Sequence, residues 1–130
     1  IRERVKALTD GRGADIVYDP VGGDMFSASM RSVKQSGKII VIGFASGDIP
    51  QIPANILMVK NISIIGYHFG GWRLLDPSGV RASMEKLLLW YETGKFKPHT
   101  SHIFPLQDYR EALEIFQSRK STGKVVLTLD

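Results

Sequence analysis

The sequence has no cysteine, no long apolar run and no glycine-rich phosphate-binding loop. Without cysteine, these residues form no disulfide, thiolate nucleophile or cysteine-ligated zinc site, and we expect a reducing, cytoplasmic environment. No segment approaches the roughly 18 apolar residues of a membrane-spanning helix, and there is no secretory signal, so no membrane partner is expected. No expected strand leads into Gly-x-Gly-x-x-Gly, which predicts that the phosphate-binding first half of a dinucleotide fold is missing.

The composition is that of a globular protein, with 43% hydrophobic and 23% charged residues in 130. The net charge of +4 is spread along the chain, and the densest cluster is Arg119, Lys120 and Lys124. We interpret this as a solvated basic surface and expect no nucleic-acid partner. A nucleic-acid-binding module is an alternative that rests on the net charge alone, and a strongly salt-dependent gel shift would support it.

Three runs rich in β-branched residues predict strands at Asp15–Asp19, Ile39–Ile42 and Ile62–Tyr67. Apolar runs without alternation are typical of strands that are buried on both faces of a parallel sheet. The segments between them are too long for hairpins and contain helical patterns. The sequence therefore predicts an α/β fold with parallel strands and right-handed crossovers.

The helical patterns place apolar residues three and four positions apart. The first helix covers Ile1 to Leu8, so the chain is expected to begin inside a helix and to be truncated. The second has Phe26, Met30 and Val33 on one face and is expected to close at Ser36-Gly37. A short helix is expected at Ala54–Val59. A long helix is expected from Pro77 to Gly94, with its apolar face formed by Met84, Leu87, Leu88 and Tyr91. Beyond it we expect a strand at Thr100–Phe104, a helix from Pro105 whose inward side chains are Tyr109, Ala112, Leu113 and Phe116, and a strand at Lys124–Leu129.

Two glycine-rich segments follow neighbouring strands, Pro20–Gly23 and Gly43–Gly47. Open α/β sheets bind ligands at the carboxyl ends of their strands, where glycine lets the backbone approach a ligand closely. The two segments predict a shared crevice. An ordinary tight turn is the alternative for the first of them.

Other patterns carry less chemistry. His99 and His102 have a spacing that suits one metal ion only on a helix, and Pro98 favours extended structure, so no metal site is expected. His68 is interpreted as a surface histidine, with a place beside a cofactor as the alternative. The segment Ser121–Lys124 leads into a strand and is not a Walker A loop. No Gly-x-Ser-x-Gly elbow supports a serine hydrolase.

Four linked segments resemble the medium-chain dehydrogenase/reductase superfamily. They are Gly11–Gly23, Gly37–Gly47, Asn61–Gly66 and Thr122–Leu127, in order and with similar spacing. Within the superfamily the chain is most similar to the zinc-independent quinone oxidoreductase branch, the relatives of zeta-crystallin. The resemblance implies a C-terminal fragment: residues 1–94 as the second half of a Rossmann-type parallel sheet with its helices, and residues 95–130 as a strand–helix–strand return segment that packs on the catalytic domain.

The resemblance also implies a cofactor site. Carried over by position, it comprises Val21, Gly22, Gly43, Phe44, Ala45, His68, Phe69 and Lys124. The first two would lie near the nicotinamide ribose and the next three would line the nicotinamide pocket. The histidine and phenylalanine would follow the third strand, and the lysine would approach the cofactor from the C-terminal segment. No residue is assigned a catalytic role and no zinc is expected.

The implied activity is hydride transfer from NADPH, with NADH not excluded, to a quinone or an α,β-unsaturated carbonyl. An enoyl or alkenal reductase of the same superfamily is the first alternative, and a non-catalytic interaction protein that keeps the fold is the second. We expect the fragment alone to be inactive. Because Asn61–Gly66 is an apolar edge strand, we expect a homodimer through this strand, as in the superfamily.

Overall fold

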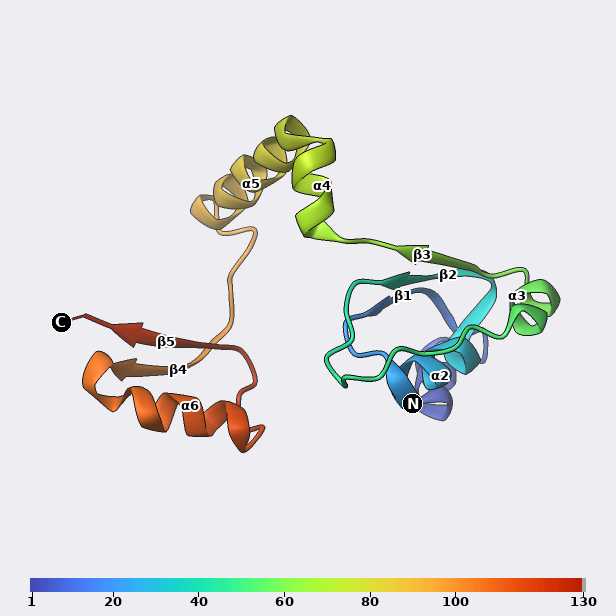
Figure 1. Cartoon of the computed structure of the whole chain (residues 1–130), viewed down its shortest axis with the longest axis horizontal. Coiled ribbons are helices and arrows are strands. Elements are labelled where there is room, and N and C mark those ends of the chain that lie inside the picture. Colours follow the sequence, from blue (N-terminus) through green and yellow to red (C-terminus); the bar gives the residue numbers. More distant parts are fainter. Residues whose placement is uncertain (130) are drawn as a thin grey trace. The chain divides into compact units, whose positions relative to one another are not determined.

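The computed structural model describes residues 1–129, and their contacts divide the chain into two compact units, residues 1–77 and the segment from residue 78 onward (Figure 1). None of the described helices combines the length and apolar character needed to cross a membrane. The predicted assignment of residues 1–94 and 95–130 to two domains of a longer protein stays a prediction.

The first unit contains a three-stranded parallel sheet. Its strands are β1 (Ala14–Asp19), β2 (Val33–Val41) and β3 (Ser63–Gly66), and β2 lies in the centre. In this register Val17 lies beside Ile39, and Ile39 beside Ile64. The α/β class, the parallel direction and the strand order are as predicted from the sequence.

Four helices belong to this unit: α1 (Arg2–Leu8), α2 (Gly23–Ser32), α3 (Ala54–Lys60) and α4 (Phe69–Leu75). The core lies between the sheet and α2 and α3, where Phe26 and Ile39 are almost fully buried and Met30, Val33 and Ile62 complete the cluster (Figure 1).

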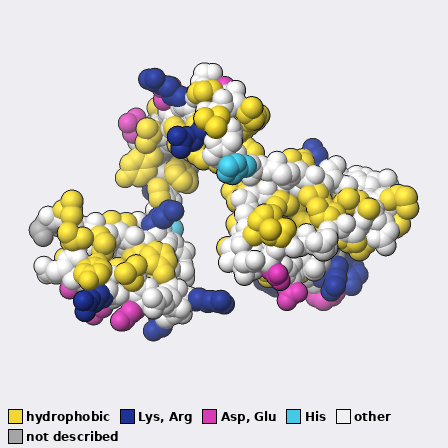
Figure 2. Space-filling model, in the orientation of Figure 1, with side chains coloured by type: hydrophobic (Ala, Val, Ile, Leu, Met, Phe, Trp, Pro, Cys, Tyr) yellow, Lys and Arg dark blue, Asp and Glu magenta, His cyan; other side chains and the backbone are white. Residues whose placement is uncertain are grey.

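The expectation that the strands are buried on both faces is wrong for this structure. Ile16 and Tyr18 are 60% and 67% exposed on β1, and Ile65 is 43% exposed on β3. Because side chains alternate along a strand, these residues share the face that α2 and α3 leave uncovered. Hydrophobic side chains are widely exposed on the visible face of both units (Figure 2).

The predicted end of the second helix is also wrong. α2 ends at Ser32, and Val33 already belongs to β2, with a register shift between Ala14 and Ile16 in the pairing with β1. The two residues predicted to close the helix, Ser36 and Gly37, lie within β2 instead; Ser36 has a φ of 60° and Gly37 is buried. Val33 still packs in the core cluster with Phe26, as its spacing predicted, but it does so as the first residue of β2 and not as part of the helix.

The sequence patterns missed α4. The helix begins shortly after β3, and its N-cap is His68, whose Nδ1 accepts a hydrogen bond from the backbone N–H of Gly71 at 3.2 Å. Residue propensities do not predict a helix here, because Gly70 and Gly71 lie in its first turn and glycine is a poor helix former.

The second unit contains a two-stranded parallel sheet with one helix across it. Its elements are α5 (Pro77–Glu92, whose first residue belongs to the first unit), β4 (Thr100–Pro105), a 3₁₀ turn at Leu106–Asp108, α6 (Tyr109–Gln117) and β5 (Lys124–Thr128). Gly94 has a φ of +70°, as predicted for a residue that ends a helix. On α6 only Ala112 is buried, so the predicted inward positions of Tyr109, Leu113 and Phe116 are wrong. A sheet of two strands offers the helix only a narrow surface.

Candidate functional site

The loops after β1 and β2 are bonded to each other. The backbone N–H of Ala45 donates to the carbonyl of Pro20 at 3.0 Å. The carbonyl of Val21 accepts from the backbone N–H of Ser46 at 3.0 Å and from its Oγ at 2.7 Å. The N–H of Gly23 then donates to the carbonyl of Asp48 at 3.1 Å. Two glycine-rich segments that are more than 20 positions apart therefore form one surface at the carboxyl ends of the strands, the place where such sheets bind ligands.

Asp19 holds the first loop in shape. Its side chain is only 3% exposed, and Oδ1 accepts hydrogen bonds from the backbone N–H groups of Val21 at 2.8 Å and Gly22 at 3.0 Å. Its Oδ2 is buried and has no hydrogen-bond partner among the described residues. A buried polar atom without a partner is costly, so this oxygen fits a ligand or water donor at the crevice. The sequence analysis did not single out Asp19; the signal available was an aspartate immediately before Pro-Val-Gly-Gly.

Gly22 is a glycine because of how the loops pack. It has φ 73° and ψ −157°, a backbone conformation that is essentially restricted to glycine. A Cβ at this position would lie 2.8 Å from the carbonyl oxygen of Asp48 and 3.0 Å from Cδ1 of Phe44. Gly22 is itself buried. Its contact with a ligand stays a prediction, and the approach of the second loop already explains the glycine.

The second loop presents the predicted residues Gly43, Phe44 and Ala45. A Cβ on Gly43 would lie 3.3 Å from the carbonyl oxygen of Pro20, so this position is tight but not closed. Phe44 is 41% exposed. Within residues 1–129, the backbone N–H groups of Gly43 and Phe44 have no hydrogen-bond partner, whereas that of Ala45 is used within the loop pair. Two donors therefore remain for a ligand at this edge of the sheet.

His68 and Phe69 follow β3, as predicted, and lie at the start of α4. His68 lines a cavity of about 260 Å³ together with Gly66, Tyr67, Gly71, Trp72 and Leu75. Phe69 does not line it and is 44% exposed. The backbone N–H of Tyr67 donates to the carbonyl of Val41 at 2.9 Å, which ties this segment to the end of β2.

Lys124 belongs to the second unit, at the beginning of β5. Its backbone N–H donates to the carbonyl of His99 at 2.8 Å and its side chain is exposed. A Cβ on the preceding Gly123 would overlap the same carbonyl, so glycine lets the two strands come together. Whether Lys124 reaches a cofactor stays a prediction.

No cluster of three or more His, Asp or Glu side chains able to hold a metal ion is found in the described part of the chain. The two histidines with metal-like spacing have other partners. His99 Nε2 lies 3.2 Å from Thr122 Oγ1, and His102 Nδ1 lies 2.9 Å from Ser101 Oγ.

Comparison with known proteins identifies relatives over nearly the whole chain. The family model described as zinc-binding dehydrogenase matches residues 2–127. The quinone oxidoreductase-like protein 2 homolog of Nematostella vectensis is 47% identical over 128 residues, covering 98% of this chain and 35% of the relative. Quinone oxidoreductase-like protein 2 of Mus musculus is 39% identical over 129 residues, covering 99% and 37%.

Solved structures agree with these relatives. The quinone oxidoreductase of Pseudomonas syringae pv. Tomato DC3000 superposes with a TM-score of 0.79 at 27% identity and covers 98% of this chain and 39% of that structure. The chain thus spans slightly more than a third of the length of the curated relatives it matches.

Proposed function

Because the chain belongs to the zinc-binding dehydrogenase family, within the medium-chain dehydrogenase/reductase superfamily, we propose that it is the C-terminal portion of an NADPH-dependent quinone oxidoreductase-like enzyme. The substrate class is a quinone or an α,β-unsaturated carbonyl. The observation that carries the proposal is the bonded pair of loops at the carboxyl ends of β1 and β2, which leaves backbone donors and a buried carboxylate oxygen at the ligand-binding edge of a parallel sheet.

The residues at this edge fit a nicotinamide cofactor. When bound, the dinucleotide supplies the hydride, and the protein supplies binding and orientation. The unused N–H groups of Gly43 and Phe44 would donate to polar groups of the cofactor, and the exposed ring of Phe44 would shield it from water. Asp19 acts indirectly, since its Oδ1 fixes the loop that carries Val21.

The described residues do not fit a zinc ion, although the family description names one. The chain has no cysteine, and its described carboxylates and imidazoles form no group of three. We propose a zinc-independent reaction because the chain resembles the zinc-independent quinone oxidoreductase branch. Hydride addition to the acceptor would leave a negative charge on its oxygen, and water would supply the proton that neutralises it, so no side chain at the loops is assigned as a proton donor.

We also propose that two copies pair through β3. The backbone N–H of Tyr67 points to β2, because it donates to Val41. Successive amides along a strand alternate in direction, so those of Ile64 and Gly66 point to the free edge of the described sheet. Antiparallel pairing of this edge across a twofold axis would use these donors and give one continuous sheet.

The experiment is a comparison of hydride acceptors on the complete protein that contains this chain. NADPH oxidation is followed with a benzoquinone and with a 2-alkenal. We expect oxidation with the quinone as acceptor. Turnover of the alkenal alone would favour an enoyl or alkenal reductase. Absence of both turnover and NADPH binding would refute the proposal and favour a non-catalytic protein that keeps the fold.

A further inference from the structure

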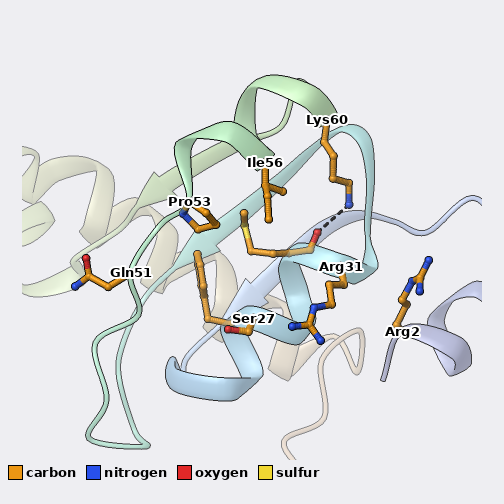
Figure 3. Close-up of a pocket in the computed structure, with 9 residues that line it drawn as sticks. Arg2, Ser27, Arg31, Gln51, Pro53, Ile56 and Lys60 are labelled. Carbon is orange, nitrogen blue, oxygen red and sulfur yellow. Dashed lines mark hydrogen bonds between the residues drawn. The ribbon is translucent and has the colours of Figure 1, made fainter.

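Two further cavities lie in the first unit, and they share part of their lining. The larger has a volume of about 400 Å³ and lies between α2 and α3, with Phe26, Met30 and Ile56 among its lining residues (Figure 3). The smaller, of about 270 Å³, shares Arg2, Arg31 and Lys60 with it. Cavities of this size hold small molecules rather than macromolecules.

The lining of the smaller cavity is strongly basic. No carboxylate lines either cavity. The cationic side chains that line the smaller cavity are six: Arg2, Lys6, Arg12, Arg31, Lys34 and Lys60. Two of the six have carboxylate partners: Arg2 lies 3.8 Å from Glu3, and Lys34 pairs with Asp15. Within residues 1–129 no ion pair is found for Lys6, Arg12 or Arg31. The cavity thus holds an excess of positive charge.

Lys60 sits where the two cavities meet. Its Nζ donates to the carbonyl of Met30 at 2.8 Å, the dashed line in Figure 3. It also donates to the carbonyl of Val33 at 2.6 Å, and the two bonds fix the ammonium beside the end of α2. Burial lowers the pKa of Lys60, and the charges of Arg2 and Lys6 lower it further. These cations therefore repel one another across the cavity, and a bound anion would relieve that repulsion.

The larger cavity has a different lining on its other side. In Figure 3 the basic side chains of Lys60, Arg31 and Arg2 lie toward one side of the view, while Gln51 and Pro53 lie toward the opposite side. The core side chains Phe26 and Met30, together with Ile56, form an apolar floor between them. A ligand that spans both cavities would have a charged end and an apolar or planar end.

The position of the smaller cavity separates it from the proposed cofactor edge. Lys60 shortly precedes β3, Val33 begins β2, and Gly13 immediately precedes β1. In a parallel sheet these residues mark the amino ends of the strands. The loops with Gly22 and Gly43 lie at the opposite, carboxyl ends.

We propose that the two cavities together bind a small molecule that carries two or more phosphate groups and an apolar or planar end. The phosphates lie among Arg2, Lys6, Arg31 and Lys60, and the other end lies on Met30 and Ile56. Several converging cations match a multiply charged anion better than a single carboxylate. The two guanidinium groups can each bind phosphate through two parallel hydrogen bonds.

The test is calorimetric titration of the chain with inorganic pyrophosphate and with ADP at low ionic strength. We expect both to bind, and ADP to bind about tenfold more tightly because its nucleoside occupies the apolar floor. Arg31→Glu should weaken both by about tenfold or more, since it removes a charge-assisted contact and adds repulsion. The matched control is Arg4→Glu, which makes the same charge change on an exposed residue of α1 that lines neither cavity.

A second variant tests the apolar cavity by itself. Ser27 is exposed and lines only the larger cavity of the two, so Ser27→Trp fills that cavity with an indole ring and leaves the cationic lining unchanged. We expect ADP then to bind no better than pyrophosphate, with pyrophosphate unchanged. When either probe is added to the unmodified chain, the amide chemical shifts of residues in α1 and at the end of α2 should change. The proposal is overturned if neither probe binds, if Arg31→Glu and Arg4→Glu weaken binding equally, if Ser27→Trp leaves ADP binding unchanged, or if the shifts move at Gly43 and Ala45 instead.

Discussion

Replacing Gly22 by alanine tests how the two loops are held together. Alanine at φ 73° and ψ −157° is strained by about 1–3 kcal/mol. Its Cβ would also lie 2.8 Å from the backbone oxygen of Asp48, and overpacking of this kind costs about 1–3 kcal/mol. Together these effects predict a loss of about 2–6 kcal/mol in the free energy of unfolding, a large part of the stability of an ordinary domain.

Two other glycines separate the contributions. Gly47 has a φ of +82° but no heavy atom within 4 Å of a built Cβ, so Gly47→Ala should cost only the strain, about 1–2 kcal/mol. Gly66 has open space and no left-handed φ, so Gly66→Ala should be neutral or stabilising by about 0.5 kcal/mol. Equilibrium urea unfolding of the three variants measures the series. Equal losses at Gly22 and Gly47 would refute the argument that Gly22 is required by loop packing.

Two further predictions concern the edge strand and an ion pair. Sedimentation of the chain at tens of micromolar, roughly the range in which such contacts form, should detect a dimer. Ile64→Pro should abolish this dimer and Ile64→Ala should retain it, because only proline removes the amide N–H that faces the free edge. A monomeric unmodified chain would contradict the pairing. The hydrogen bond and charge of Lys34 lower the pKa of Asp15 below 3.8. The pair therefore stabilises the fold above that pH, and its contribution is lost as the pH falls through the lowered pKa. Asp15→Asn should then make the free energy of unfolding depend less on pH on the acid side. An unchanged pH dependence would be evidence against the pair.

The strands and their direction were predictable because β-branched runs that are joined by long, helix-containing connections leave few alternatives to parallel pairing. The extent of α2 was not. Val33 satisfies the helical spacing from Phe26 and Met30, so the pattern cannot tell whether the residue occupies a helix or the beginning of a strand. α4 was missed since its cap is a histidine side chain and its first turn contains two glycines.

The candidate site was predictable as a pair of glycine-rich loops, but not in its internal bonding. The role of Asp19 depends on the backbone turning back on its carboxylate, which residue type alone does not reveal. The basic cavities depend on cations at positions 2, 6, 31 and 60 that come together only in the fold. The densest basic cluster in the sequence, at 119–124, lies in the other unit.

The most direct test of the central claim is the dissociation constant for NADPH of the complete protein carrying Gly43→Val. A branched side chain there would crowd the carbonyl of Pro20, which a Cβ already approaches to 3.3 Å, and would occupy the edge where the cofactor is proposed to lie. We expect NADPH binding to weaken by about 1–3 kcal/mol, roughly fivefold to more than a hundredfold, while Gly47→Ala in the same loop leaves it unchanged. An unchanged dissociation constant for Gly43→Val would contradict the assignment of this crevice to the cofactor.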